Sequence, residues 1–306
     1  MKQYPSYLNL SEIQFRDRIK QAYHCLQSCR LCPHHCGVNR IAGQKGFCRS
    51  TVQMQISSFN AHFGEEPPIS GTKGSGTIFF TNCTLRCLYC QNYPISQLGN
   101  GNPVSISDLS GMMLDLQKQK CHNINLVTPT HFVPQIIEAV RESRSSGLHI
   151  PLVYNTCGYE SLVTLQLLDG IIDIYLPDSK YVDNLIAEKY SRAENYFSVM
   201  KEALEEMYRQ VGDLKIDKEG IAVSGLLVRH LVLPHNLAGT DKVLKWIAGK
   251  LSKETYISLM AQYFPAFQAS DYPELSRRIN HGEYRKARDA FERCGLKNGW
   301  IQEHST

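Results

Sequence analysis

Residues 77–90 read Thr-Ile-Phe-Phe-Thr-Asn-Cys-Thr-Leu-Arg-Cys-Leu-Tyr-Cys, so an apolar run passes directly into a loop that carries Cys83, Cys87 and Cys90. A short apolar run that follows glycine-rich turn residues is typical of a strand buried on both faces. In α/β barrels, the loops after the strands carry the chemistry. The stretch therefore predicts a first barrel strand with a metal-binding loop at its carboxyl end.

Working outward from this stretch, β-type and helix-type segments alternate through most of the chain. The sequence predicts strands at residues 77–81, 124–128, 150–155, 171–176, 226–233 and 256–262. It predicts helices at residues 12–27, 107–120, 133–145, 160–168, 185–211, 240–251 and 272–294. Strand–helix alternation gives parallel βαβ units with right-handed crossovers. We therefore expect an α/β fold, a partial (β/α)6 TIM-like barrel, with an N-terminal Cys-rich metal-binding extension.

The chain divides by composition into three parts. Residues 1–75 are rich in Cys, His and Gly and short of periodic apolar pattern, which predicts a Cys-rich extension after one helix. Residues 76–265 hold the predicted barrel core, and residues 266–306 form a C-terminal helical segment. With 306 residues the chain is long enough to bury a large core.

Charge and cysteine usage restrict the class of protein. The formal net charge of +4 is small for this length, which argues against a nucleic-acid or membrane surface. No apolar stretch approaches the ~20 residues that span a bilayer, and the first ten residues lack a secretory pattern. Most of the eleven cysteines crowd two short stretches. We expect a cytoplasmic protein whose thiols bind metal rather than form disulfides.

The three cysteines of residues 83–90 point to one particular chemistry. Three thiolates can hold three irons of a [4Fe–4S] cluster and leave the fourth iron without a protein ligand. An open iron can chelate the amine and carboxylate of S-adenosylmethionine (SAM), whose reductive cleavage gives a 5′-deoxyadenosyl radical that abstracts hydrogen from a substrate. The alternative is a zinc knuckle with a distant fourth ligand.

The cysteine spacing, with Tyr89 before the last cysteine, resembles the signature of the radical SAM superfamily. A closer likeness is to an uncharacterised radical SAM family related to pyruvate formate-lyase activating enzymes. It is carried by residues 29–48, 80–97, 125–131, 152–159, 173–181 and 229–234. The resemblance implies the barrel fold and SAM chemistry, and it suggests a glycyl-radical enzyme as a protein substrate.

The same resemblance suggests residues that face SAM. The segment that begins Asn155-Thr156 resembles an Asp-Thr-Asn-Gly segment of the activating enzymes, and Asp178-Ser-Lys180 resembles their Asp-Leu-Lys segment. By that likeness, Thr156 and Asp178 ligate a monovalent cation and Lys180 faces SAM. Asn155 departs from the pattern, because the activating enzymes carry an acid there. The alternative for Asp178 and Lys180 is a solvated pair at the end of a strand.

One motif of many radical SAM proteins is missing. They use Gly-Gly-Glu after the second strand to bind the amino group of SAM, whereas this chain has Thr128-Pro-Thr130-His131. We expect backbone carbonyls to bind the amino group, with Thr130 or His131 nearby; a buried or helix-capping role is the alternative for His131. Arg229 aligns with a basic residue of the activating enzymes, and an internal salt bridge is its alternative role.

A second group of cysteines lies in the N-terminal extension. Cys29, Cys32, Cys36 and Cys48 can close a tetrahedral set of thiolates, as in structural zinc or a fully ligated [4Fe–4S] cluster. With no open position, this site is expected to be structural or an electron relay. Free cysteines are the alternative. The remaining Cys121, Cys157 and Cys294 are expected to be small buried residues rather than ligands.

Partners and rival functions follow from this chemistry. The cluster must be reduced, so a flavodoxin- or ferredoxin-like protein is the expected electron donor. A rival activity is radical modification of a peptide or small metabolite. The non-enzyme rival is a zinc-binding adaptor in which both cysteine groups bind zinc.

Overall fold

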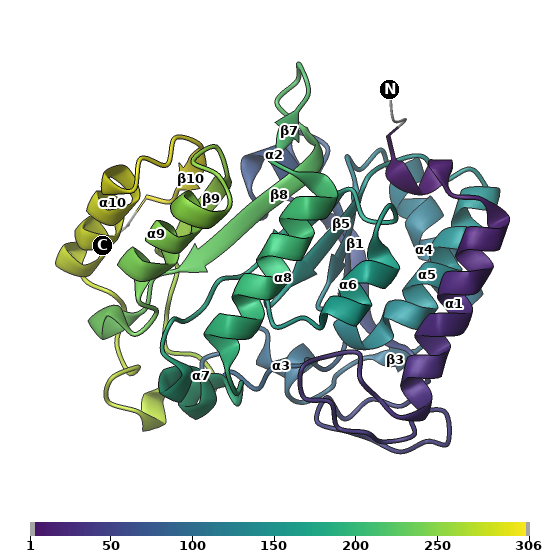
Figure 1. Cartoon of the computed structure of the whole chain (residues 1–306), viewed down its shortest axis with the longest axis horizontal. Coiled ribbons are helices and arrows are strands. Elements are labelled where there is room, and N and C mark those ends of the chain that lie inside the picture. The colour runs from purple at the N-terminus through teal and green to yellow at the C-terminus, as the bar shows by residue number, and fades with distance from the viewer. Residues whose placement is uncertain (1–3, 304–306) are drawn as a thin grey trace.

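The computed structural model describes residues 4–303, whose strands form one ten-stranded sheet in the order β10-β9-β8-β6-β5-β4-β2-β1-β3, with β7 paired to β8 (Figure 1). The strands are β1 (Gln55–His62), β2 (Ser75–Phe80), β3 (Asn102–Pro103), β4 (Ile124–Val127), β5 (Leu152–Thr156), β6 (Ile174–Pro177), β7 (Lys215–Ile216), β8 (Ala222–Leu231), β9 (Tyr256–Met260) and β10 (Gly299–Ile301). Strands β2, β4, β5, β6, β8 and β9 are consecutive parallel neighbours. This confirms the predicted partial barrel.

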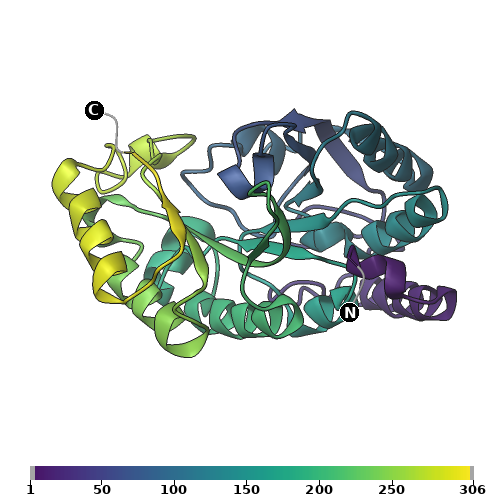
Figure 2. The ribbon, with the colours of Figure 1, turned by 90° about the horizontal axis from the view of Figure 1, so that it is seen from above.

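The longer helices form an arc over the outer face of the curved sheet, and the two ends of the sheet face each other across an open side (Figure 2). The helices of the described residues are α1 (Glu12–Gln27), α2 (Pro67–Ser70), α3 (Tyr93–Ser96), α4 (Ile106–Lys118), α5 (Val133–Ser145), α6 (Leu162–Leu168), α7 (Asn184–Ser191), α8 (Tyr196–Val211), α9 (Thr240–Lys250) and α10 (His281–Arg293). Helix α1 packs on α5 at one end of the arc. The barrel is therefore open on one side.

The central strands are buried on both faces, as their uniform apolar pattern predicts. Every residue of β5 and β6 is buried, between the outer helices and the barrel interior. The amphipathic helices bury one face against this sheet; in α5 that face includes Ile136, Ile137 and Val140. This packing fixes the carboxyl ends of the parallel strands at one edge of the barrel.

The antiparallel strand β1 was not predicted. It lies within residues 1–75 and pairs with β2 from Ile56, opposite Phe80, to His62, opposite Ser75. Its sequence, QISSFNAH, is largely polar and only one of its residues is buried, so the apolar pattern that marks the other strands is absent. Strand β10, in residues 266–306, likewise adds to the sheet beside β9. The division into three parts stays a prediction.

Two predicted helices differ from the structure. Residues 185–211 form two helices, α7 and α8, because Arg192 and Asn195 between them adopt left-handed backbone angles, with φ of 55° and 52°. The predicted helix at residues 272–294 begins only at His281, where Asn280 and Glu283 form a capping box. Within residues 4–303, no helix is both long and apolar enough to cross a membrane.

Candidate active site

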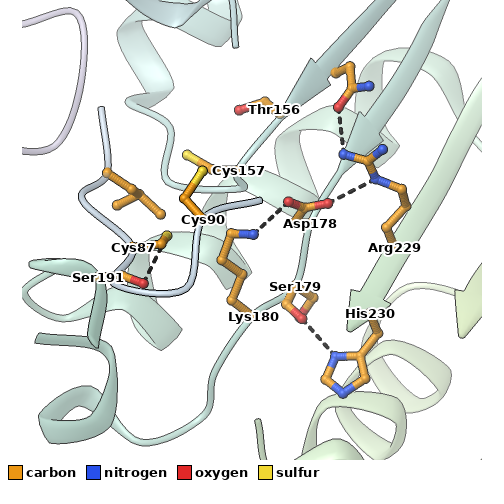
Figure 3. Close-up of polar contacts among 12 residues, drawn as sticks. Cys87, Cys90, Thr156, Cys157, Asp178, Ser179, Lys180, Ser191, Arg229 and His230 are labelled. Atoms are coloured by element: carbon orange, nitrogen blue, oxygen red, sulfur yellow. Dashed lines mark hydrogen bonds and ion pairs between the residues drawn. The ribbon is translucent and has the colours of Figure 1, made fainter. Parts of the chain in front are cut away.

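The three-cysteine loop (residues 83–90) follows β2 at the carboxyl edge of the parallel strands. The backbone N–H of Leu85 donates to Cys83 Sγ at 3.3 Å. The Ser191 hydroxyl donates to Cys87 Sγ at 3.0 Å (Figure 3). Cys90 Sγ lies 3.1 Å from the hydroxyl of Ser96, which ends the short helix α3. Hydrogen bonds to cysteine sulfur stabilise thiolates and tune iron–sulfur clusters.

The donor set of this loop fits an iron–sulfur cluster. Burial raises the pKa of the Cys87 thiol to about 12, against the opposing charge of Lys180. Since a buried free thiol is neutral, a bound metal would supply the charge that holds it as a thiolate. The Cys83 and Cys90 sulfurs lie within electrostatic range of Cys87. Within residues 4–303, no three His, Cys, Asp or Glu side chains are arranged to hold a single metal ion.

A row of charged side chains runs from this loop into the barrel. Lys180 Nζ lies 2.7 Å from Asp178 Oδ2, and Arg229 Nε lies 2.8 Å from Asp178 Oδ1 (Figure 3). Arg229 also donates to Asn155 Oδ1 at 2.6 Å. The charged side chains are only 16–18% exposed, so this is a buried network and not a solvated pair. Both oxygens of Asp178 therefore already have a basic partner.

Glu65, which the sequence did not single out, extends the row. Its carboxylate lies 3.3 Å from Arg229 Nη1 and accepts from Asn125 Nδ2 at 3.0 Å and Asn155 Nδ2 at 3.4 Å. Arg229 therefore makes ion pairs inside the barrel with carboxylates from two elements. Glu65 follows β1, and because that strand lacks an apolar pattern, no local signal indicated that this residue enters the barrel.

The predicted residues Thr130 and Thr156 meet at a second carboxylate that sequence reasoning missed. Both hydroxyls donate to Glu160 Oε1, Thr130 at 2.6 Å, and the Tyr154 hydroxyl donates to Oε2 at 3.2 Å. Burial raises the pKa of Glu160 to about 8. The carboxyl group ties the ends of β4 and β5 together, and this role positions both threonines.

His131 is 1% exposed and lies behind the end of β2. Its Nε2 is 2.7 Å from the carbonyl oxygen of Thr81, and its Nδ1 has no partner among the described residues. Burial, aided by the charge of Arg40, lowers the pKa of His131 to about 3, so the ring is neutral at pH 7. The structure therefore places His131 next to the chain that leads into the three-cysteine loop, as a buried neutral residue.

Cys157 is buried, as expected, but it lies beside the three-cysteine loop. Its sulfur is 3.5 Å from Thr84 Oγ1 and lies near the Cys83 thiol. In the sequence, the one indication of this location was that Cys157 directly follows Thr156 at the end of β5.

The N-terminal extension packs directly on the three-cysteine loop. His34 Nε2 lies 2.8 Å from the Thr84 carbonyl oxygen, and the Arg86 guanidinium donates to the Phe47 carbonyl oxygen at 2.8 Å. The extension and α3 also lie together in Figure 1. The two groups of cysteines, distant in sequence, therefore belong to one region of the molecule.

The four cysteines of the extension lie near one another. The backbone N–H of Cys29 donates to the Val38 carbonyl oxygen at 2.9 Å, and the Gly37 N–H donates to the Cys29 carbonyl oxygen at 3.1 Å. The Cys32 thiol lies within electrostatic range of the other three cysteines. A Cβ at Gly46 would lie 2.4 Å from Cys36 Sγ, so only glycine fits beside that sulfur. The metal at this site stays a prediction.

The fold defines the class of protein structurally: a parallel six-stranded partial barrel with a three-cysteine loop at the carboxyl end of its first strand, an architecture that this chain shares with a solved [FeFe]-hydrogenase maturase. A solved structure of HydG, a maturase of the [FeFe]-hydrogenase, aligns with 96% of this chain at a TM-score of 0.50 and 10% identity. HydG from Carboxydothermus hydrogenoformans aligns with 72% of the chain at a TM-score of 0.49 and 14% identity. The chain covers 58% and 50% of those two structures.

The sequence comparison defines the family more narrowly. The chain is 30% identical over 292 residues to the uncharacterized protein MJ0674 of Methanocaldococcus jannaschii. The alignment covers 91% of this chain and 78% of that relative. The chain belongs to the family of that protein. No protein-family model matches the chain.

Proposed function

We propose that this chain is a radical SAM iron–sulfur enzyme whose catalytic cluster is held by Cys83, Cys87 and Cys90. The observation that carries the proposal is the position of these thiols, in one hydrogen-bonded loop at the carboxyl edge of a partial barrel. When bound, a [4Fe–4S] cluster supplies the electron that cleaves SAM to a 5′-deoxyadenosyl radical, which then takes hydrogen from a substrate.

The residues around the loop have distinct roles in this proposal. Lys180, held by Asp178 at 2.7 Å, presents an ammonium group beside Cys87 and is suited to pair with the carboxylate of SAM. Ser191 stabilises the Cys87 thiolate through its hydroxyl. Thr130 and Thr156, both tied to Glu160, fix the backbone where the amino group of SAM is expected to bind. Because Asp178 already has two basic partners, the proposal does not need a monovalent cation.

The finer activity is an inference from resemblance. A glycyl-radical enzyme as protein substrate is suggested by the likeness to pyruvate formate-lyase activating enzymes, and a small metabolite or peptide is the alternative. A flavodoxin- or ferredoxin-like donor would supply the electron. The site at Cys29, Cys32, Cys36 and Cys48 would hold zinc or an auxiliary [4Fe–4S] cluster next to the catalytic loop.

Anaerobic reconstitution with iron and sulfide tests the proposal. The protein should turn brown, and it should form 5′-deoxyadenosine from SAM when dithionite is added. Cys87→Ala should abolish this product, because the loop loses one cluster ligand. The matched control is Cys294→Ala, since Cys294 follows α10, outside the loop, and should leave the product unchanged.

The zinc-binding adaptor predicts a different result. If the reconstituted protein stays colourless, holds one zinc ion at the three-cysteine loop and does not cleave SAM, the proposal is wrong. If it is brown but Cys87→Ala cleaves SAM as fast as the wild type, the catalytic cluster lies elsewhere and the assignment of the loop is wrong.

A further inference from the structure

Arg40 of the N-terminal extension is completely buried, with 0% of its surface exposed. Its Nη2 donates to the Thr51 carbonyl oxygen at 2.6 Å, and its guanidinium carbon lies 5.7 Å from the centre of the Phe132 ring. Among the described residues, its Nε and Nη1 atoms have no hydrogen-bond partner, and no carboxylate forms an ion pair with it. The side chain is therefore a buried cation without an anionic partner.

A guanidinium group keeps its charge at any pH that a folded protein tolerates, so Arg40 cannot escape this cost by losing a proton. A buried charge without a counter-charge is strongly destabilising. One carbonyl oxygen and one ring face stabilise a cation in part, but they carry no negative charge. Because the unpartnered atoms are closed off from solvent, the missing negative charge has to come from groups of the protein that are already beside them.

The group beside Arg40 is the cysteine cluster of the extension. Arg40 donates its backbone N–H to the Leu26 carbonyl oxygen near the end of α1 at 2.9 Å, so its segment runs alongside the chain that leads to Cys29. The Arg40 charge acts directly on the Cys29 thiol. Cys29 is only 3% exposed and lies close to Cys32, which in turn lies close to the other two cysteines of the set. Water therefore screens the interaction between Arg40 and this cluster very little.

We propose that Cys29, Cys32, Cys36 and Cys48 form a metal–thiolate centre for which Arg40 is the buried counter-ion. Free thiols in an apolar setting are neutral, whereas a bound metal holds them as thiolates. Four thiolates outweigh the positive charge of one zinc ion or of a [4Fe–4S] core, so the centre is an anion with either metal. The alternative of free cysteines leaves the charge of Arg40 unbalanced. The inference rests on the metal site of the proposed function and not on its radical chemistry.

The test uses the full chain with Cys83→Ala, Cys87→Ala and Cys90→Ala, so that bound metal reports the N-terminal site alone. The protein is loaded anaerobically with zinc, or with iron and sulfide, and its metal content is followed by mass spectrometry during competition with EDTA. Adding Arg40→Gln should lower the EDTA concentration that removes half of the metal about tenfold or more, the usual loss when a residue that supports metal ligands is changed. Arg40→Lys keeps the charge and should lose less.

The matched control is Arg30→Gln, because Arg30 directly follows Cys29 in the chain but is exposed. Solvent screens its charge, so this change should leave metal retention as it was.

A second measurement separates a counter-ion from a residue that only fills space. Removing the metal should lower the melting temperature more in the protein that has Arg40 than in Arg40→Gln, because only the former is left with an unbalanced buried charge. A residue with a purely structural role would lower the melting temperature of the metal-loaded and the metal-free protein equally.

Three results would overturn the inference: no metal at the N-terminal site, equal metal retention after Arg40→Gln, or equal melting shifts on metal removal. The first is also measured on the wild type, as metal in excess of the catalytic cluster, so it stands even if the variants do not fold. Formation of 5′-deoxyadenosine is assayed on the wild type. Product together with Arg40-independent metal refutes this inference and leaves the radical chemistry intact. Arg40-dependent metal without product supports the inference and refutes the radical chemistry.

Discussion

Replacing Asp178 by Asn should destabilise the protein strongly. The carboxylate lies 2.7 Å from Lys180 and 2.8 Å from Arg229, and all three side chains are 16–18% exposed. Removing one partner of a buried ion pair costs about 3–5 kcal/mol, because the remaining charge stays buried. The partial exposure places this case at the lower end, about 3 kcal/mol. With an unfolding entropy of about 2.1 cal/mol/K for each residue, the melting temperature should fall by about 5 °C.

Thermal unfolding followed by circular dichroism measures this shift. The matched control is Asp115→Asn, because Asp115 pairs with Lys118 at 3.0 Å but both side chains are more than half exposed. An exposed pair contributes little, so the control should melt with the wild type. If Asp178→Asn melts within 1 °C of the wild type, the charged row is not the buried network described above, and the reasoning fails.

A second check is the pH dependence of the difference in melting temperature between Asp178→Asn and the wild type. Burial alone would raise the pKa of Asp178, but Arg229 and Lys180 together outweigh it and hold the pKa below the ordinary value of 3.8. A carboxyl group with a lowered folded-state pKa stabilises the protein above its unfolded pKa, and this stability is lost as the pH falls through the folded value. The difference in melting temperature should stay constant from about pH 8 to pH 5 and shrink below about pH 4.

Three further predictions address single residues. Ser191→Ala removes the hydroxyl that donates to Cys87 Sγ, so spectroelectrochemical titration should give a lower reduction potential for the catalytic cluster; an unchanged or higher potential contradicts this role. Cys157→Ala should retain the change that SAM makes in the EPR spectrum of the reduced cluster, whereas loss of that change would make Cys157 a ligand. Burial raises the pKa of Asp173 to about 6. Because this carboxyl group ionises less readily in the folded than in the unfolded protein, it lowers the free energy of unfolding as the pH rises from about 4 to 6. The melting temperature of Asp173→Asn should accordingly fall less than that of the wild type over this interval, and an equal fall would contradict the assignment.

The barrel could be predicted because its strands carry a local signal. Each parallel strand is a short apolar run, since both of its faces are buried, and the loop with its three cysteines follows the first of them directly. Strand β1 has no such signal, because it lies at the side of the sheet with most of its residues partly or fully exposed. Its pairing with β2 depends on contacts across the sheet and not on its own composition.

The site could be predicted only where a residue belongs to a motif or ends a strand. Asp178, Lys180 and Thr156 end parallel strands, so topology alone brings them to one edge. Glu160 and Glu65 lie outside any motif, and only the tertiary structure shows that their carboxylates bind the predicted threonines and Arg229. Residues that act through hydrogen bonds to other functional residues therefore cannot be identified from a single sequence.

The order of charges in the barrel bears on how a substrate could bind. Lys180, Asp178, Arg229 and Glu65 alternate in sign, and the two inner members each contact both neighbours. Neutralising either of them would leave an unpaired buried charge, and every member of the row already has an oppositely charged partner. The row that reaches the cluster loop is therefore complete without a ligand.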